Sequence, residues 1–517
     1  MTSAADVRFA LLARHEIALL DVREEAAFAH AHPLFAANLP LSRLEVEALD
    51  RLPRRNVPIV VYDDGEGYAA RARRVLKALG YGNTSLLHGG LQGWRDAGFE
   101  LFRDVNSYSK AFGELVEARR HTPSLPAPEV RARIERGDDL VVLDARRFEE
   151  YCTMSIPGGI SVPGAELALR APVVAPNPET TIIVNCAGRT RSLIGAQSLI
   201  NAGLPNPVFA LRNGTIGWTL EDFALDHGKI RQVTDGDPAG LETARQRARA
   251  VAYRAGVKHI GLDELERFIA DRTRTLYRFD VRQPQDFAAG HPRGFRNYPG
   301  GQLVQETDMA APVRGARIVL HDDLGPRADM TAAWLAQMGW EVYVATGLAN
   351  TARGADPLNL PELPEVEMLS PAGLAAAQAA GAILIDLATS PVYVRGHIDN
   401  AVFAIRARLA AADSDSLQSD DVVLTSTGGA LARFAAAELV RPGRRVRALD
   451  GGNNAFVAAG GTLVAGTGTR LHPFDDVYRR PYEGTDNPRA AMQAYLDWEY
   501  GLVAQLERDA THGFFVI

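Results

Sequence analysis

Cysteine is nearly absent from this chain. Only two cysteines, Cys152 and Cys186, occur among 517 residues, so a disulfide framework is excluded and a reducing intracellular compartment is expected. Charged side chains interrupt residues 1–23, which leaves no apolar core for a signal peptide. We therefore expect a cytoplasmic protein.

Several other features are also missing. No apolar run approaches the ~18 residues that a membrane-spanning helix needs. The net charge of -7 provides no strongly basic domain, so neither nucleic acid nor a membrane is an expected partner. The twelve histidines are scattered, no Cys-x-x-Cys or His-x-x-x-His pair occurs, and no Gly-x-Gly-x-x-Gly segment follows a predicted strand. We therefore expect no metal site and no cofactor.

The length of the chain predicts several domains. At ~150 residues per domain, 517 residues predict three or four domains rather than one core. The sequence also contains a fourfold repeat. An apolar run that ends in aspartate, typical of a short buried strand, recurs four times. The four aspartates are Asp21, Asp144, Asp280 and Asp386.

A second apolar run follows each of these strands and ends in a loop. The first loop residues are Asp63, Cys186, Asp322 and Ser426, which lie 42, 42, 42 and 40 residues after the strand aspartates. A helical pattern and a glycine turn come next in each repeat. Strand, loop, helix, strand and turn in this order predict a parallel sheet flanked by helices.

We therefore expect an α/β protein of four tandem domains and a C-terminal extension. Proline-rich and polar joints place the domains at residues 1–105, 125–225, 255–350 and 367–465. The extension covers residues 466–517, and residues 487–508 are predicted to form one amphipathic helix. Its apolar face contains Tyr495, Trp498, Leu502 and Leu506. We expect this face to dock against a neighbouring domain.

Only the second of the four loops begins with a thiol. It reads Cys186-Ala187-Gly188-Arg189-Thr190-Arg191, and Ser192 is expected to begin the helix. A loop between a buried strand and a helix turns successive backbone N–H groups toward one point, which creates an anion site without a metal. The helix end, Arg189 and Arg191 are expected to lower the pKa of Cys186, so that it is largely a nucleophilic thiolate at neutral pH.

Several motifs together resemble the rhodanese family of sulfurtransferases. They are the Leu-Asp-x-Arg segment at residues 143–146, the stretch 155–159, the loop 186–191 and the turn that ends at Gly217-Trp218. The resemblance covers four tandem rhodanese-like domains and is strongest in the second. It implies that Cys186 takes the sulfane sulfur of thiosulfate or a similar donor and releases sulfite. The Cys186 persulfide would then pass its sulfur to cyanide or a thiol.

The resemblance also assigns roles to neighbouring residues. The donor would be bound by Ala187, Gly188, Arg189, Thr190 and Arg191. The two arginines would hold its sulfonate, and Asp144 with Arg146 would support the fold beneath the loop. One departure is Ser155, which stands where rhodanese-like chains often have histidine.

Loop length separates sulfur transfer from related chemistries. Rhodanese-like phosphatases and arsenate reductases resemble the pattern of cysteine, five residues and arginine, whereas only four residues separate Cys186 from Arg191. A phosphatase or arsenate reductase is therefore a less favoured alternative. A second alternative is a persulfide carrier or docking protein whose donor and acceptor are other proteins.

The other three domains are expected to be catalytically silent. Asp63 and Asp322 place carboxylates, and Ser426 a hydroxyl, where a persulfide needs sulfur. We expect these domains to act as scaffold, interface or gate. Cys152 is expected to be a packing residue, and a disulfide with Cys186 is the alternative.

Overall fold

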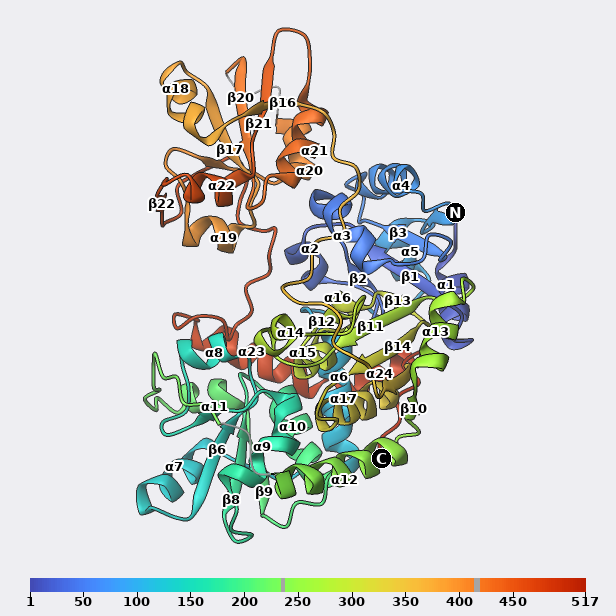
Figure 1. Ribbon diagram of the computed structural model, residues 1–517, viewed down its shortest axis with the longest axis vertical. Coiled ribbons are helices and arrows are strands. Elements are labelled where there is room, and N and C mark those ends of the chain that lie inside the picture. Colours follow the sequence, from blue (N-terminus) through green and yellow to red (C-terminus); the bar gives the residue numbers. More distant parts are fainter. Residues whose placement is uncertain (234–237, 413–418) are drawn as a thin grey trace.

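The chain folds into four α/β domains in sequence order (Figure 1). The structure is a computed structural model that describes residues 1–233, 238–412 and 419–517. Residues 413–418, which belong to the predicted fourth domain, lie outside the described residues. The fourth domain lies at one end of the elongated molecule and the second domain lies at the other (Figure 1). The predicted α/β class with parallel sheets flanked by helices is confirmed.

The second domain shows how the repeat produces a sheet. Its strands are β5 (Ser124–Leu125), β6 (Leu140–Asp144), β7 (Ile160–Ser161), β8 (Thr181–Asn185) and β9 (Val208–Leu211). They pair in parallel in the order β5-β9-β8-β6-β7. The apolar strands β6 and β8 therefore lie in the middle of the sheet, where Leu143, Ile182 and Val184 are buried.

A helix follows each of these strands. The helices are α7 (Ala127–Arg136), α8 (Phe148–Thr153), α9 (Leu167–Val174), α10 (Thr190–Asn201) and α11 (Gly214–Leu220). Helix α10 begins at Thr190, two positions before the expected start at Ser192. The reason is that the Arg189 carbonyl accepts the Leu193 N–H at 3.0 Å, which closes a helical turn from residue 189 onward.

The main sheets of the other three domains have a similar strand order, although in the first domain an isolated bridge of Thr2 with Leu87 stands in the place of β5. The first contains β1 (Ile17–Asp21), β2 (Ala37–Asn38), β3 (Ile59–Tyr62) and β4 (Thr84–Leu86). The third contains β10 (Lys258–Ile260), β11 (Leu276–Asp280), β12 (Arg296–Asn297), β14 (Arg317–His321) and β15 (Glu341–Ala345). The fourth contains β16 (Glu367–Leu369), β17 (Ile383–Asp386), β19 (Val402–Phe403), β20 (Asp421–Thr425) and β21 (Arg445–Leu449). Strand β23 (Thr469–Arg470), which falls in the predicted extension, pairs with β19 and belongs to the fourth sheet.

The first and third domains share a sheet. Strand β13 (Val313–Arg314) of the third domain pairs antiparallel with β1 of the first, with Arg314 opposite Ile17 and Val313 opposite Ala18. Backbone hydrogen bonds therefore join two domains that are far apart in the sequence.

Helix α6 (Ser107–Arg120) joins the first two domains and lies in the interior of the molecule (Figure 1). Every residue from Ser107 to Val116 is buried. It packs against α10 and against two helices of the C-terminal extension, α23 (Arg489–Tyr500) and α24 (Leu502–Asp509). The prediction of a single helix over 487–508 is wrong in one respect. The segment forms two helices that are divided at Gly501, a residue of low helix propensity.

None of the helices in the described part of the chain combines the length and the apolar character needed to cross a bilayer.

Candidate active site

Cys186 is the first residue after the buried strand β8, and α10 begins four positions later. This placement puts the thiol beside the positive end of a twelve-residue helix. The first N–H groups of a helix, here those of Thr190 and the residues after it, have no partner within the helix. Those of Thr190 and Arg191 are therefore available to an anion, whereas that of Ser192 bonds to the Cys186 sulfur.

The glycine turn of the same domain holds the carbonyl groups of this loop. The Thr215 backbone N–H donates to the Cys186 carbonyl at 2.8 Å, and the Ile216 N–H donates to the Ala187 carbonyl at 2.9 Å. A β-carbon at Gly214, where φ is +52°, would lie 2.6 Å from the Gly188 carbonyl oxygen, so only glycine fits there. Because a trans peptide directs its C=O and N–H oppositely, the N–H groups that follow these carbonyls face away from the turn.

The matching loops in the first and third domains contain their own anion. A carboxylate oxygen of Asp63 accepts the backbone N–H of Ala69 at 2.9 Å. A carboxylate oxygen of Asp322 accepts the N–H of Arg327 at 2.9 Å. In both loops a side-chain carboxylate thus occupies the place of a bound anion. The second domain has Cys186 in this position, and its sulfur is hydrogen-bonded by Ser192, so a nucleophilic thiol stands where the sister loops carry a carboxylate.

The Cys186 thiol does not have the expected lowered pKa. The residue is 2% exposed, and this burial raises the pKa of the thiol, although the charge of Arg191 and hydrogen bonds from Ser192 act in the opposite direction. The carboxylate of Glu499 raises it further. The expectation of a thiolate at neutral pH considered only the loop, whereas desolvation comes from all the elements packed around it.

Asp144 and Arg146 lie beneath the loop as a buried pair. The Arg146 Nε and Nη2 groups donate to the two Asp144 carboxylate oxygens at 2.8 and 2.7 Å. Asp144 also accepts from the Asn185 side-chain amide at 2.8 Å, and Asn185 immediately precedes Cys186. The pair therefore restrains the end of β8, the strand from which the thiol projects.

Arg189 faces a different part of the molecule. Its guanidinium donates to both carboxylate oxygens of Glu114 at 2.8 Å and forms an ion pair with Glu117, both on α6. Its remaining donors reach Asn213 at 3.2 Å and the Tyr500 hydroxyl at 2.9 Å. These contacts use the five N–H donors of an arginine, so in this conformation none is left for a sulfonate.

Arg191, unlike Arg189, has a direct electrostatic influence on the Cys186 thiol. Two of its nitrogens donate to the Glu150 carboxylate at 2.8 Å. Burial would raise the pKa of Glu150, but the Arg191 guanidinium lowers it to about 2, so the pair is ionised at neutral pH. The same guanidinium lowers the pKa of Cys186, whereas Arg189 is not among the principal influences on it.

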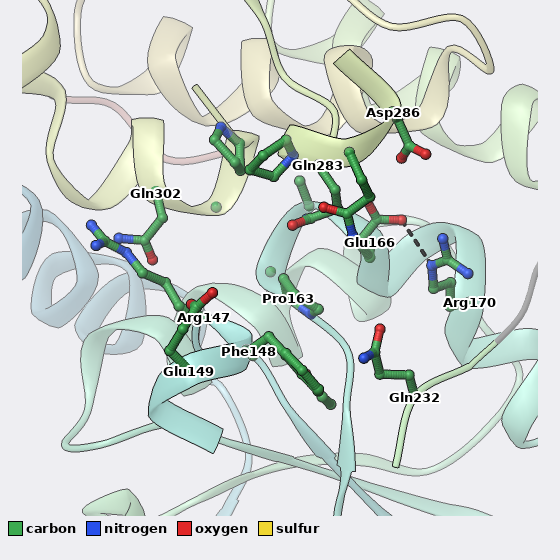
Figure 2. Close-up of a pocket in the computed structure, with 18 of the residues that line it drawn as sticks. Arg147, Phe148, Glu149, Pro163, Glu166, Arg170, Gln232, Gln283, Asp286 and Gln302 are labelled. Carbon is green, nitrogen blue, oxygen red and sulfur yellow. Dashed lines mark hydrogen bonds and ion pairs between the residues drawn. The ribbon is translucent and has the colours of Figure 1, made fainter. Parts of the chain in front are cut away.

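A cavity lies between the second and third domains (Figure 2). Its volume is about 740 Å³, and Cys186 is not among the residues that line it. Both arginines that line it are ion-paired: Arg170 with Glu166 at 2.9 Å, and Arg147 with Glu306 at 2.7 Å. One wall contributes Gln302, whose side-chain oxygen is 3.5 Å from Arg191. The cavity is therefore a neighbour of the thiol loop rather than its mouth.

Helix α23 of the C-terminal extension covers the thiol loop. A β-carbon at Gly188 would lie 3.1 Å from the Tyr495 ring and 3.3 Å from a Glu499 carboxylate oxygen. Tyr495 was expected on the docking face of this helix, whereas Glu499 was not singled out as a site residue. The sequence does not reveal this contact, because Glu499 is separated from the loop by two further domains.

The second cysteine lies apart from these groups. Cys152 is half-buried on α8, and both cysteines are free thiols. Within the described ranges, no cluster of three or more histidine, cysteine, aspartate or glutamate side chains is arranged to hold a metal ion. The buried Ser155 hydroxyl lacks a hydrogen-bond partner among the described residues.

Comparisons with known proteins agree with this geometry. Four segments, residues 6–97, 126–221, 262–347 and 370–459, match the family model of the rhodanese-like domain. The crystal structure of a thiosulfate sulfurtransferase from Pseudomonas aeruginosa is 56% identical in sequence and superposes with a TM-score of 0.98, with 100% of each chain covered.

A curated protein is also similar. SseB of Mycobacterium tuberculosis, provisionally named a thiosulfate sulfurtransferase, is 31% identical over 124 residues. The aligned part makes up 22% of this chain and 43% of SseB, so the similarity spans less than half of that protein.

Proposed function

This chain belongs to the rhodanese family, and on that premise we propose that it is a thiosulfate sulfurtransferase that works through a persulfide on Cys186. The proposal depends above all on one observation. Carboxylates of Asp63 and Asp322 accept helix N–H groups in two sister domains, whereas the second domain places a thiol at this position, where a nucleophile can attack a donor held by the loop. The name of the similar Pseudomonas aeruginosa enzyme supports thiosulfate as the donor.

The donor half-reaction forms one sulfur–sulfur bond and breaks another. The Cys186 sulfur, as thiolate, attacks the sulfane sulfur of thiosulfate, and the electron pair of the old S–S bond leaves with sulfite. The loop N–H groups from Ala187 to Arg191 hold the sulfonate, and the Arg191 charge favours the anion. Arg189 anchors the loop to α6, and Asp144 with Arg146 fixes the end of β8.

The acceptor half-reaction removes the sulfane sulfur. A thiol or cyanide attacks the outer sulfur of the persulfide, and Cys186 departs with the electron pair of the S–S bond. We favour a small acceptor over a docked protein, because Cys186 is buried beneath α23.

We also infer that the reaction takes place in the cytoplasm, where the scarcity of cysteine is expected, and that the other three domains serve as a scaffold.

Intact-protein mass spectrometry tests this proposal. Incubation with thiosulfate in the absence of reductant should add one sulfur atom to the peptide that contains Cys186, with release of one equivalent of sulfite. Cys186→Ser should abolish both, whereas Cys152→Ser, the matched control, should retain both. Sulfite release by Cys186→Ser would refute the proposal. Hydrolysis of a phosphate ester or reduction of arsenate, without sulfur uptake, would favour the phosphatase or arsenate reductase alternative.

A further inference from the structure

Glu499 is a buried carboxylate that faces the thiol loop from the C-terminal extension. Its side chain is 0% exposed. One oxygen, Oε1, accepts the Tyr495 hydroxyl hydrogen at 2.8 Å. The other, Oε2, has no hydrogen-bond partner among the described residues and would lie 3.3 Å from a β-carbon at Gly188. An unpartnered oxygen at this depth is unusual, because buried polar atoms are nearly always hydrogen-bonded.

Among the described residues, no ion pair holds the Glu499 carboxylate. The cation with the strongest effect on it, Lys110 on α6, is 1% exposed and donates instead to Asp104 at 2.6 Å. The Lys110 ammonium is also enclosed by aromatic rings, including that of Tyr495 at 4.9 Å. Arg189 is saturated by its own partners. Glu499 is therefore not held in place as half of a salt bridge.

The groups around Glu499 come from every element packed on it. They are Lys110 and Glu114 on α6, Arg189 and Cys186 of the thiol loop, and Tyr495 on α23 itself. Burial raises the pKa of Glu499 to about 8, with a further rise from Glu114, whereas Lys110, Tyr495 and Arg189 lower it. At pH 7 the carboxyl is therefore mostly protonated and the carboxylate is the minor form, so that both a proton donor and a proton acceptor are present near neutral pH.

We propose that Glu499 is a further catalytic residue of this site, which carries protons to and from the sulfur atoms that react on Cys186. This inference rests on the proposed sulfurtransferase function and deepens it. The geometry supports it because the free oxygen of Glu499 lies against Gly188, two residues from the thiol. The burial of Cys186 supports it too, because a thiol with a raised pKa needs a base before it can attack.

The proton transfers balance in both half-reactions. With the donor, Glu499 takes the Cys186 proton, the thiolate attacks thiosulfate, sulfite leaves, and the proton returns to the outer sulfur of the new persulfide. With a thiol acceptor, Glu499 takes the acceptor proton, the acceptor sulfur attacks the outer persulfide sulfur, and the departing Cys186 sulfur receives the proton. The acceptor gains a persulfide, and Glu499 ends each half-reaction as the carboxylate with which it began.

The acceptor half-reaction provides the test. The full-length protein is loaded with thiosulfate, freed of excess donor and mixed with small thiols that differ in pKa, and the loss of the Cys186 persulfide is followed by mass spectrometry. In Glu499→Gln, transfer at pH 7 to a thiol of high pKa should fall roughly 100-fold or more, the usual contribution of general base catalysis. Transfer to a thiol that is already ionised should remain near the wild-type rate.

Two further variants separate this role from a structural one. Asp497→Asn changes an exposed carboxylate on the same helix and should behave like the wild type. Tyr495→Phe removes a hydrogen bond that lowers the pKa of Glu499. The midpoint of the pH–rate profile of the acceptor half-reaction should therefore move to higher pH. An equal loss for all acceptors in Glu499→Gln, or an unmoved midpoint in Tyr495→Phe, would overturn the inference. Failure of the wild type to load sulfur on Cys186 would instead refute the proposed function.

Discussion

Arg189 and Glu114 form a bidentate ion pair, with both N–O distances at 2.8 Å, between the loop of the second domain and the helix that links the first domain to it. Both side chains are almost completely buried. The pair therefore joins the thiol loop to the interior of the molecule, and it links the stability of the loop to the packing of α6.

Removal of Glu114 should destabilise the protein. In Glu114→Ala the Arg189 charge loses its bidentate partner while it stays buried, and breaking such a pair costs on the order of 3 kcal/mol of unfolding free energy. Urea unfolding of the full chain measures the change. Glu117→Ala is the matched control, because Glu117 contacts the same guanidinium from a more exposed position, and its loss should be smaller. Equal losses in the two variants would contradict this assignment.

Substitution of Gly214 should impair the thiol loop. In Gly214→Ala the new β-carbon would collide with the carbonyl oxygens of Cys186 and Gly188, so the loop has to move. A displacement of about 1 Å at a reacting group can reduce the rate roughly 100-fold. Sulfite release from thiosulfate measures this effect.

Gly203→Ala provides the control for that experiment. Gly203 also has positive φ, at +71°, but no atom lies within 4 Å of the added carbon. It should lose some stability through backbone strain and keep its rate of sulfite release. An equally impaired Gly203→Ala would show that strain alone explains the loss.

A buried glutamate in the first domain should make stability depend on pH. Burial raises the pKa of Glu24 to about 7, although Arg43 and Ser42 lower it. The folded state then retains a proton that the unfolded state loses above about pH 4.5. The contribution of Glu24 to stability is therefore present at low pH and is lost as the pH rises toward 7.

Glu24→Gln should remove this dependence. Urea unfolding at pH 5 and at pH 8 measures the change. Between these values the unfolding free energy of the wild type should fall by on the order of 1 to 3 kcal/mol more than that of the variant, because one pKa unit corresponds to about 1.4 kcal/mol. Parallel behaviour of the two proteins across this range would contradict the assignment of a raised pKa to Glu24.

The two cysteines should differ in their reaction with alkylating agents. Burial raises the pKa of both thiols, but Cys186 is 2% exposed and covered by α23, whereas Cys152 is half-buried on the surface of α8. At pH 7, iodoacetamide should therefore modify Cys152 first, as followed by peptide mass spectrometry. Earlier modification of Cys186 would mean that the thiol loop is open in solution.

The sequence predicted the fold well because the repeat is local. Each strand pair, such as β6 with β8, reveals itself through an apolar run of fixed spacing, and parallel pairing follows from the intervening helix. The helix of the extension was predicted less well, because Gly501 divides it and its docking partners lie far away in the sequence. The pairing of β13 with β1 across two domains had no local signal at all.

The candidate site shows the same division. The sequence identified Cys186 as the thiol of the loop, and the family resemblance implied that Asp144 and Arg146 support the fold beneath it; the structure shows that these two form a buried pair bonded to Asn185, the residue before Cys186. The expected lowering of the Cys186 pKa is not found, because Arg189 is paired with Glu114 and burial raises the pKa of the thiol. Whether Arg189 contacts a donor during the reaction stays a prediction.

By itself, therefore, the amino-acid sequence determined the four α/β repeats and the position of a lone thiol at a strand–helix loop, because both depend on the spacing of residues within one repeat. The tertiary structure alone decided which side chains surround that thiol. Arg189 and Tyr500 lie 311 residues apart in sequence yet share a hydrogen bond. Burial, and with it the pKa of a buried group, is the sum of contributions from all the segments that meet at one point, and that sum exists only after the chain has folded.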